Sequence, residues 1–235
     1  MIVGRLRPAC GVGNGRLRLA LRGRLWRTLT VLSRSTHAES AVVSARLCRK
    51  LDVNCLNPLS PDITSDKDGI VRFDVVPDDP AVGFTGYVIF SKPELMTGLY
   101  FFNPAVDRPV HIGAVQMVTP TVANLLTLQV GAAYDQSRGI ILFNTLDCTA
   151  QSSAGVMLEV DPRDPLLLRF YAIDGLPTAS AVATDMDGWG GLINVPVGTT
   201  TVTGRLADGG RRIGTVSLFV KPNTISYSRM VPLGT

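Results

Sequence analysis

The chain has 235 residues, of which 46% are hydrophobic and 18% are charged. This balance excludes an intrinsically disordered chain, and the absence of any apolar run of about 18 residues excludes a membrane-spanning helix. The net charge of +4 comes from eight arginines among residues 1–38, a segment without acidic residues; beyond it, 15 basic residues face 19 acidic ones. The resulting net charge of −4 argues against nucleic acid as a partner.

The N-terminal segment is open to two interpretations. Its arginines and leucines are typical of an organellar transit peptide, and it lacks the apolar core of a secretory signal. However, Arg16–Arg22 alternates arginine with apolar residues at period two, which favours a half-exposed strand. We favour a first strand within residues 16–31, after a loose or misassigned start at residues 1–15.

Short strands are expected on both sides of one helix. Val71, Phe73 and Val75 alternate with charged residues, as in a half-buried antiparallel strand. Turn signals recur about every 8–12 residues, which predicts β-sandwiches. The strands are expected at residues 41–48, 71–75, 86–90, 99–102 and 112–118, and then at 139–143, 156–160, 166–173, 199–206, 215–220 and 225–231.

Residues 119–134 carry the signals of a linker helix. Thr119 can cap it, and Pro120 suits the first helical position. An apolar stripe at helical spacing is expected to be buried on a sandwich, whereas an exposed stripe would indicate an element that binds a partner. The stripe consists of Val122, Leu125, Leu126, Val130 and Ala133.

One segment occurs twice. Ser65–Gly69 returns 119 residues later as Thr184–Gly188, and Val76-Pro77 returns as Val195-Pro196. This self-similarity predicts two copies of one folding unit, at residues 16–118 and 138–232, with Gly69 and Gly188 at equivalent hairpin turns and no sheet running through both units.

These residues resemble a known family. Thr184–Gly188, a strand, and then Asn194–Val202 look like the repeated motif of carboxypeptidase regulatory-like domains, and Cys48–Cys55 followed by Asp66–Gly69 resembles the second strand and turn of the same module. The resemblance implies an all-β fold of two tandem seven-stranded, transthyretin-like (prealbumin-like) Greek-key sandwiches. It also implies a non-catalytic structural or binding module of a secreted or envelope-associated bacterial protein.

The four cysteines are Cys10, Cys48, Cys55 and Cys148. Two of them, Cys48 and Cys55, are close in sequence, and no histidine lies near either, so a structural zinc site is not expected. A disulfide between Cys48 and Cys55 and a pair of buried free thiols both remain open.

The repeated Asp-x-Asp-Gly raises the question of calcium. In an EF-hand alignment, Val75 or Asn194 would occupy the position of the bidentate acidic ligand. We therefore expect structural turns, without metal or other cofactor. The turn residues are Asp66, Asp68 and Gly69 in the first copy and Asp185, Asp187 and Gly188 in the second.

No catalytic residues are predicted. Transthyretin-like sandwiches include a purine-pathway hydrolase that uses histidines and a C-terminal Tyr-Arg-Gly-Ser. This chain has His37 and His111, neither in the second unit, and Ser226–Arg229 lacks the glycine. The alternative function is a hydrolase with a site at the domain junction.

Aromatic residues suggest a binding surface. In a strand, Tyr100, Phe101 and Phe102 cannot all face one core, and Trp189 follows the second turn. Exposed, they would suit carbohydrate or a protein partner; the alternative is that they cover the domain junction or the linker helix. The ligand and the oligomeric state are left open.

Overall fold

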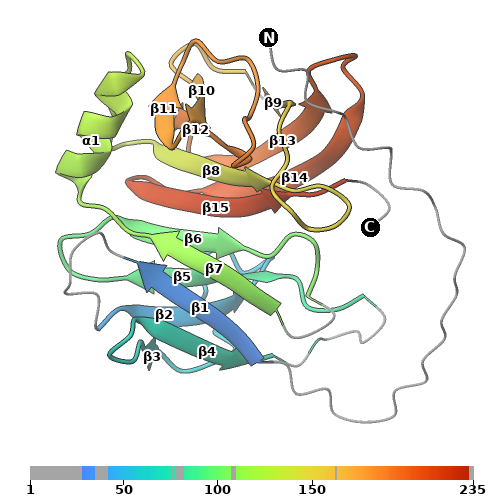
Figure 1. Ribbon diagram of the computed structural model, residues 1–235. Coiled ribbons are helices and arrows are strands. Elements are labelled where there is room, and N and C mark those ends of the chain that lie inside the picture. The colour runs from blue at the N-terminus through green and yellow to red at the C-terminus, as the bar shows by residue number, and fades with distance from the viewer. Residues whose placement is uncertain are drawn as a thin grey trace, which may run out of the picture.

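The computed structural model describes residues 28–34, 42–75, 77, 82–106, 110–161 and 163–232 (Figure 1). Residues 1–27, Cys10 and His37 lie outside these ranges, so both interpretations of the N-terminal segment stay predictions. The first half contains β1 (Thr28–Arg34), β2 (Ser44–Arg49), β3 (Ile63–Thr64), β4 (Ile70–Asp74), β5 (Gly86–Ser91), β6 (Thr97–Phe101) and β7 (Val110–Gln116).

Helix α1 (Pro120–Gln129) follows β7 and leads into the second half. No helix in the described ranges is long and apolar enough to cross a membrane. The second half contains β8 (Gly139–Thr145), β9 (Val156–Asp161), β10 (Leu168–Ile173), β11 (Leu176–Thr178), β12 (Trp189–Val195), β13 (Gly198–Leu206), β14 (Arg212–Val220) and β15 (Thr224–Met230).

Both halves use the same strand pairings. β1 pairs antiparallel with β4 and parallel with β7, just as β8 pairs with β12 and β15. β5 lies between β2 and β6, just as β13 lies between β9 and β14. The halves differ in one element, because β3 pairs with β2, whereas the β10–β11 hairpin joins the edge of β12.

One expectation about the sheets was wrong. A single nine-stranded sheet, in the order β11-β10-β12-β8-β15-β6-β5-β2-β3, runs through both halves. It is continuous because β6 and β15 pair in parallel, with residues 97–100 opposite residues 224–227; Figure 1 shows them side by side. Each is an edge strand of its own half, and an edge strand presents unpaired backbone groups that another strand can satisfy.

The two three-stranded sheets cover opposite faces of the nine-stranded sheet. Sheet β4-β1-β7 shares a core with one face of β2, β5, β6 and β15. Sheet β14-β13-β9 shares a second core with the other face, which includes β8 and β12 and also reaches β5 and β6. The strands near the junction are therefore buried on both faces, which favours continuous apolar sequence.

This double burial explains the position of the three consecutive aromatic residues at the end of β6. Tyr100, Phe101 and Phe102 are only 6%, 2% and 6% exposed, which contradicts an exposed binding surface at these residues and agrees with the alternative that they are packed. Tyr100 and Phe102 lie in the first core, and Phe101 lies in the second. The centroid of the Phe101 ring lies 4.9 Å from that of Phe219 and 5.3 Å from that of Tyr87, so these residues cover the junction.

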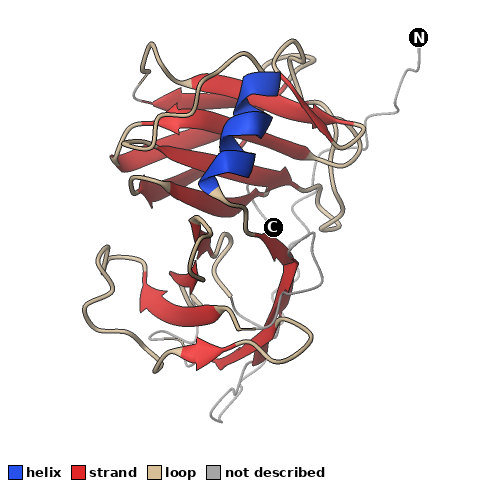
Figure 2. Ribbon diagram, turned by 90° about the vertical axis from the view of Figure 1, so that its left-hand side faces the viewer, coloured by secondary structure: helices blue, strands red, loops and turns tan. Residues whose placement is uncertain are grey.

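The start of the helix was predicted correctly. Thr119 caps it by accepting a hydrogen bond from the Val122 backbone N–H to its side-chain oxygen at 3.2 Å, and Pro120 occupies the first turn. The helix was expected to extend to residue 134, but it ends at Gln129. Figure 2 shows it lying across strands of the second half.

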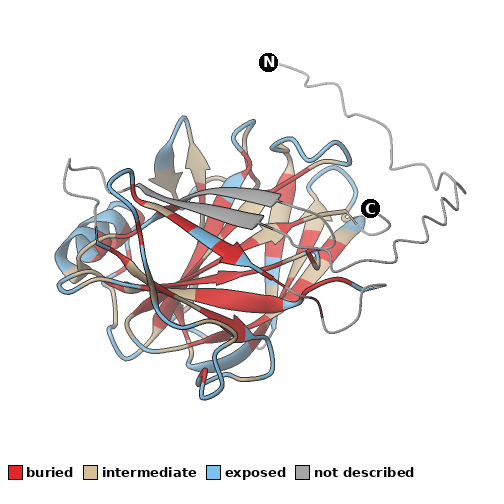
Figure 3. Ribbon diagram, turned by 90° about the horizontal axis from the view of Figure 1, so that it is seen from below, coloured by how far each residue is buried: buried red, intermediate tan, exposed pale blue. Residues whose placement is uncertain are grey.

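The predicted orientation of the helix was wrong. Val122, Leu125 and Leu126 were expected to be buried, but they are 42%, 58% and 41% exposed. The buried helical residues are instead the small side chains of Ala123 and Thr127, which allow the helix to approach the sheet closely. Figure 3 shows exposed residues along the helix, in contrast to the buried strands.

The shared sheet and shared cores predict that the two halves unfold together. Calorimetry of the full chain should give one cooperative transition. Phe219→Ala should lower its midpoint by ~6–20 °C, because truncating a buried Phe costs ~3–5 kcal/mol. Leu51→Ala, at a side chain that is 93% exposed, is the control and should leave it nearly unchanged. Two separated transitions, with Phe219→Ala shifting one of them, would contradict a common core.

Candidate protein-binding surface

The face of the nine-stranded sheet that forms the first core continues, partly uncovered, into the second half. One cross-strand row of residues shows this continuity. In register it runs through Leu47, Val88, Tyr100, Tyr227, Leu142, Gly191 and Phe170. Sheet β4-β1-β7 covers the beginning of the row, whereas Leu142 and Phe170, at its far end, are half-buried.

A groove of about 640 Å³ lies over this far end. Asp187 is the one charged residue among those that line it. The sheet contributes Ile140, Leu142, Phe170, Ala172, Trp189, Gly190, Ile193, Ile225 and Tyr227; the helix contributes Ala123, Leu126 and Thr127; and the remaining lining comes from Gln116, Val118, Ser152, Gly175, Pro177 and Asp187.

A glycine determines the shape of the groove floor. A Cβ atom on Gly191 would lie 2.7 Å from the Phe170 ring and 2.6 Å from the Ile141 carbonyl oxygen. Glycine therefore lets the Phe170 ring lie across β12, and the ring forms apolar floor where a side chain at position 191 would otherwise project.

The segment after the helix is fixed by a buried asparagine. Asn194 is 7% exposed and has a φ of 56°. Its side-chain nitrogen donates to the Ala133 carbonyl oxygen at 2.9 Å, and its side-chain oxygen accepts from the Asp135 backbone N–H at 2.9 Å. Val130 and Ala132 pack beside it on Ile193. These contacts set the rotation of the helix and so turn its apolar residues outward.

The outward side of α1 is an apolar ridge, formed by Val122, Leu125 and Leu128, which are 42%, 58% and 52% exposed. At about 100° per residue, Leu125 lies roughly opposite Ala123 and Thr127. The helix contains no charged residue. This feature is visible in the sequence and could have indicated that both sides of the helix contact protein, because a helix without a charged side is normally covered.

The repeated turns use their carboxylates for backbone hydrogen bonds. Gly69 and Gly188 have φ values of 75° and 71° and directly precede the equivalent strands β4 and β12. Asp66 accepts from the backbone N–H groups of Asp68 and Ile70, at 3.0 and 2.9 Å, and the bond from Ile70 is the largest cause of its lowered pKa.

The second turn repeats this arrangement. One carboxylate oxygen of Asp185 accepts from the Asp187 N–H at 3.0 Å, and the other accepts from the Asp174 N–H at 2.9 Å. Within the described ranges, no group of three or more potential ligand side chains is arranged to hold a metal ion.

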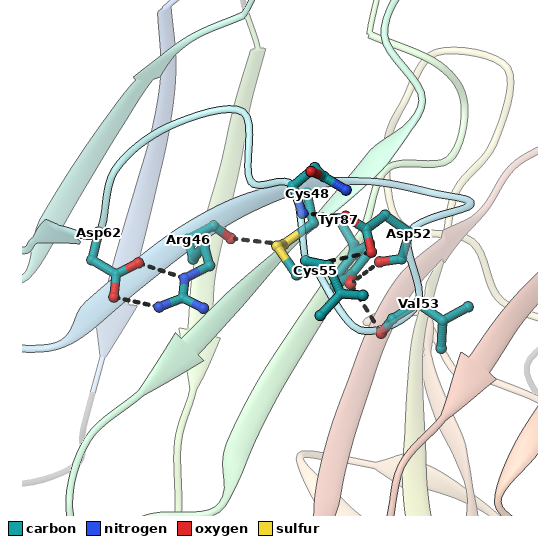
Figure 4. The surroundings of a disulfide bond; sticks show 9 residues. Arg46, Cys48, Asp52, Val53, Cys55, Asp62 and Tyr87 are labelled. Atoms are coloured by element: carbon teal, nitrogen blue, oxygen red, sulfur yellow. Dashed lines mark hydrogen bonds and ion pairs between the residues drawn. A yellow bond between two sulfur atoms is a disulfide. The ribbon is translucent and has the colours of Figure 1, made fainter.

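A disulfide joins Cys48 and Cys55, whose Cα atoms are 5.4 Å apart (Figure 4). Within the loop that it closes, the Tyr87 hydroxyl donates to the Asp52 carbonyl oxygen at 2.6 Å. Burial, and then the charge of Asp52, raise the pKa of Tyr87 to about 12. Both cysteines belong to the core shared with the second half, so the disulfide supports the junction.

A second cavity, of about 780 Å³, lies between β9 and β10, where the shifted β10–β11 hairpin leaves a gap. Three of its five charged residues have partners within the chain. Glu159 pairs with Arg205 at 2.6 Å, Asp164 pairs with Arg138 at 2.9 Å, and Arg169 donates to the Leu158 carbonyl oxygen at 2.7 Å. This cavity is therefore a weaker candidate for a ligand than the apolar groove.

The remaining site residues are dispersed. His111 lies in β7, opposite Thr30 of β1, and His37 is outside the described ranges. Trp189, at the start of β12, is 39% exposed at the groove. Phe219 and Asn194, which hold the junction and the helix, were missed as key residues, because their partners are distant in sequence.

No family model and no curated protein matches the chain. The D295N mutant of the shaft pilin SpaA from Lactobacillus rhamnosus GG aligns at 10% identity over 88% of this chain and 98% of its own, with a TM-score of 0.28. A streptococcal ancillary pilin aligns at 14% identity over 88% and 63%, with a TM-score of 0.28. The Bacillus anthracis TIE protein aligns at 10% identity over 88% and 34%, with a TM-score of 0.27, so this chain spans about a third of it. Similarity at this level carries no argument about function.

Replacing Asn194 should loosen the helix. Asn194→Gly tolerates the positive φ but leaves the Ala133 carbonyl and the Asp135 N–H without their partner, so it should cost ~1–3 kcal/mol in urea denaturation. Amide exchange in α1 should also accelerate. Glu94→Gly is the matched control, because Glu94 is exposed and has a φ of 69° in the loop between β5 and β6, away from this contact. Equal effects of the two variants would contradict the role of Asn194.

Calcium should not stabilise the fold. A ligand at 100 times its Kd adds ~2.7 kcal/mol, which would raise the Tm by several degrees. Because the turn carboxylates already accept backbone N–H groups, thermal melts with millimolar calcium and with chelator should coincide. A rise in calcium that Asp66→Ala or Asp185→Ala abolishes would show instead that the turns bind metal.

Proposed function

We propose that the chain is a non-catalytic structural module that binds protein through helix α1 and the adjacent groove. The module consists of two tandem transthyretin-like sandwich units, at residues 16–118 and 138–232, in a secreted or envelope-associated protein. The observation that carries the binding role is the uncharged, outward-facing apolar ridge beside an apolar groove.

The tandem arrangement is supported by the pairings that the halves share. The antiparallel and parallel neighbours of β1 and β8 correspond, as do those of β5 and β13. The turns that precede β4 and β12 correspond as well. One sandwich unit used twice accounts for these correspondences, with β10 and β11 as a departure in the second copy.

The proposed location is supported by the disulfide. Disulfides persist mainly in oxidising compartments such as the cell exterior and the bacterial periplasm. The bond between Cys48 and Cys55 lies in the core that joins the two halves, so the junction would depend on such an environment.

A binding role fits the junction and the groove better than hydrolysis does. Phe101, Phe219 and Tyr87 occupy the junction as packed aromatic rings rather than as the lining of a polar cleft. The groove likewise presents apolar side chains, with Asp187 as its one charge, whereas hydrolysis requires a nucleophile or base with convergent polar groups.

Carbohydrate binding is the second candidate, and Trp189 favours it. This indole is 39% exposed, and Asp187 and Ser152 line the same groove. Aromatic faces beside polar groups can hold sugars, but the apolar ridge has no part in such a site.

An apolar fluorescent probe tests the protein-binding surface. At ~0.1 µM native protein, anilinonaphthalene sulfonate should bind saturably, since large exposed apolar patches accept such ligands. Leu126→Asp, in the groove wall, should weaken probe binding at least ~5-fold. Leu51→Asp, at an exposed leucine of the disulfide loop, is the control and should not change it.

Two results would contradict this function. One is a native chain that does not bind the probe. The other is oligosaccharide binding, measured in a Trp26→Phe background as quenching of the Trp189 fluorescence. If Trp189→Ala abolishes this binding and Leu126→Asp leaves it unchanged, a carbohydrate-binding module is favoured.

A further inference from the structure

We propose that the partner on this surface is a second copy of the chain, held in a two-fold symmetric dimer in which the ridge of each copy lies in the groove of the other. This inference rests on the proposed protein-binding function and specifies its partner. It follows from the shape, the charge and the area of the surface.

The shape is self-complementary. The ridge formed by Val122, Leu125 and Leu128 stands directly beside the groove, because Leu126 of the same helix forms part of the groove wall. A two-fold axis uses the same patch on both subunits, so a ridge and a groove side by side can be satisfied simultaneously by one rotation. Each Leu125 would then cover the floor that Phe170 and its neighbours leave half-exposed.

The charge distribution favours a second copy over a charged partner. The helix has no charged residue, and Asp187 is the one charge on the groove lining. A basic or acidic peptide, or an anionic membrane surface, would have to bury charges without opposite charges to pair with them, which is costly. Depletion of charge is instead typical of the centre of a protein interface, and the second copy brings an equally neutral surface.

The available area reaches what a dimer needs. Trp189 extends the groove and is 39% exposed, and Val122, Leu125, Leu126 and Leu128 on the helix are 42%, 58%, 41% and 52% exposed. Together they offer somewhat more than the area of two whole large apolar side chains, or roughly 350 Å². Since about 60% of an interface is apolar, this corresponds to roughly 580 Å² per copy and ~1,150 Å² in total, above the ~1,000 Å² that a specific interface needs.

Sedimentation velocity on the full chain tests the dimer. Over about 1–100 µM, the wild type should pass from monomer toward twice the monomer mass, without larger species. Leu125→Asp should raise the dimer Kd at least ~30-fold, since it places a charge at the centre of the interface in both copies. Leu51→Asp should dimerise as the wild type does, and far-UV circular dichroism should show that all variants are folded.

Mixing two variants tests the symmetry. Ala172→Asp blocks the groove, and Leu125→Asp blocks the ridge, so each variant alone should be monomeric. A mixture should regain partial association, because the intact ridge of one variant can enter the intact groove of the other. Wild-type protein that grows beyond a dimer would contradict the two-fold arrangement.

The outcomes separate this inference from the proposed function. A wild type that stays monomeric up to about 100 µM, or a dimer that Leu125→Asp leaves unchanged, overturns the second copy as partner. If the monomer nevertheless binds the apolar probe and Leu126→Asp removes that binding, the protein-binding function stands with a different protein as partner. If neither dimer nor probe binding is observed, both proposals fail.

Discussion

The parallel pairing of β6 with β15 is the contact on which the rest of the structure depends. It satisfies the free edges of the two halves at once and joins their strands into one sheet of nine. Once the sheet is continuous, both of its faces near the junction must be covered. This explains why Tyr100 and Phe101, neighbours on one strand, both lie in cores, and why Phe219 of the second half packs on Tyr87 and Phe101 of the first.

The sequence predicted what depends on neighbouring residues. Asp66–Gly69 and Asp185–Gly188 form turns because an aspartate carboxylate and a positive-φ glycine lie within one turn of each other. Thr119 caps the helix for the same local reason. The burial of Tyr100 and the rotation of α1 were not predictable in this way. They depend on β15 and on Asn194, which lie far along the chain, and no periodicity in one segment reports such partners.

The two halves are not equivalent at their outer faces. Around the junction, β5 and β6 present Tyr87 and Phe101 to the second half. At the corresponding strands of the second half, β13 and β14 instead carry hydroxyl pairs, between Thr201 and Ser217 at 3.0 Å and between Thr203 and Thr215 at 3.1 Å. This face therefore lacks the aromatic surface that β5 and β6 present across the junction.

The remaining apolar surface lies on the opposite face, and the fold itself holds it there. Asn194 and the packing of Val130 on Ile193 fix the rotation of α1, so the ridge cannot turn inward without breaking two part-buried hydrogen bonds. Leaving leucines half-exposed forgoes the ~25 cal/mol per Å² that their burial would contribute. A fold that holds apolar side chains outward in this way is best explained if another surface covers them, because the free energy not gained within the chain is then recovered on association.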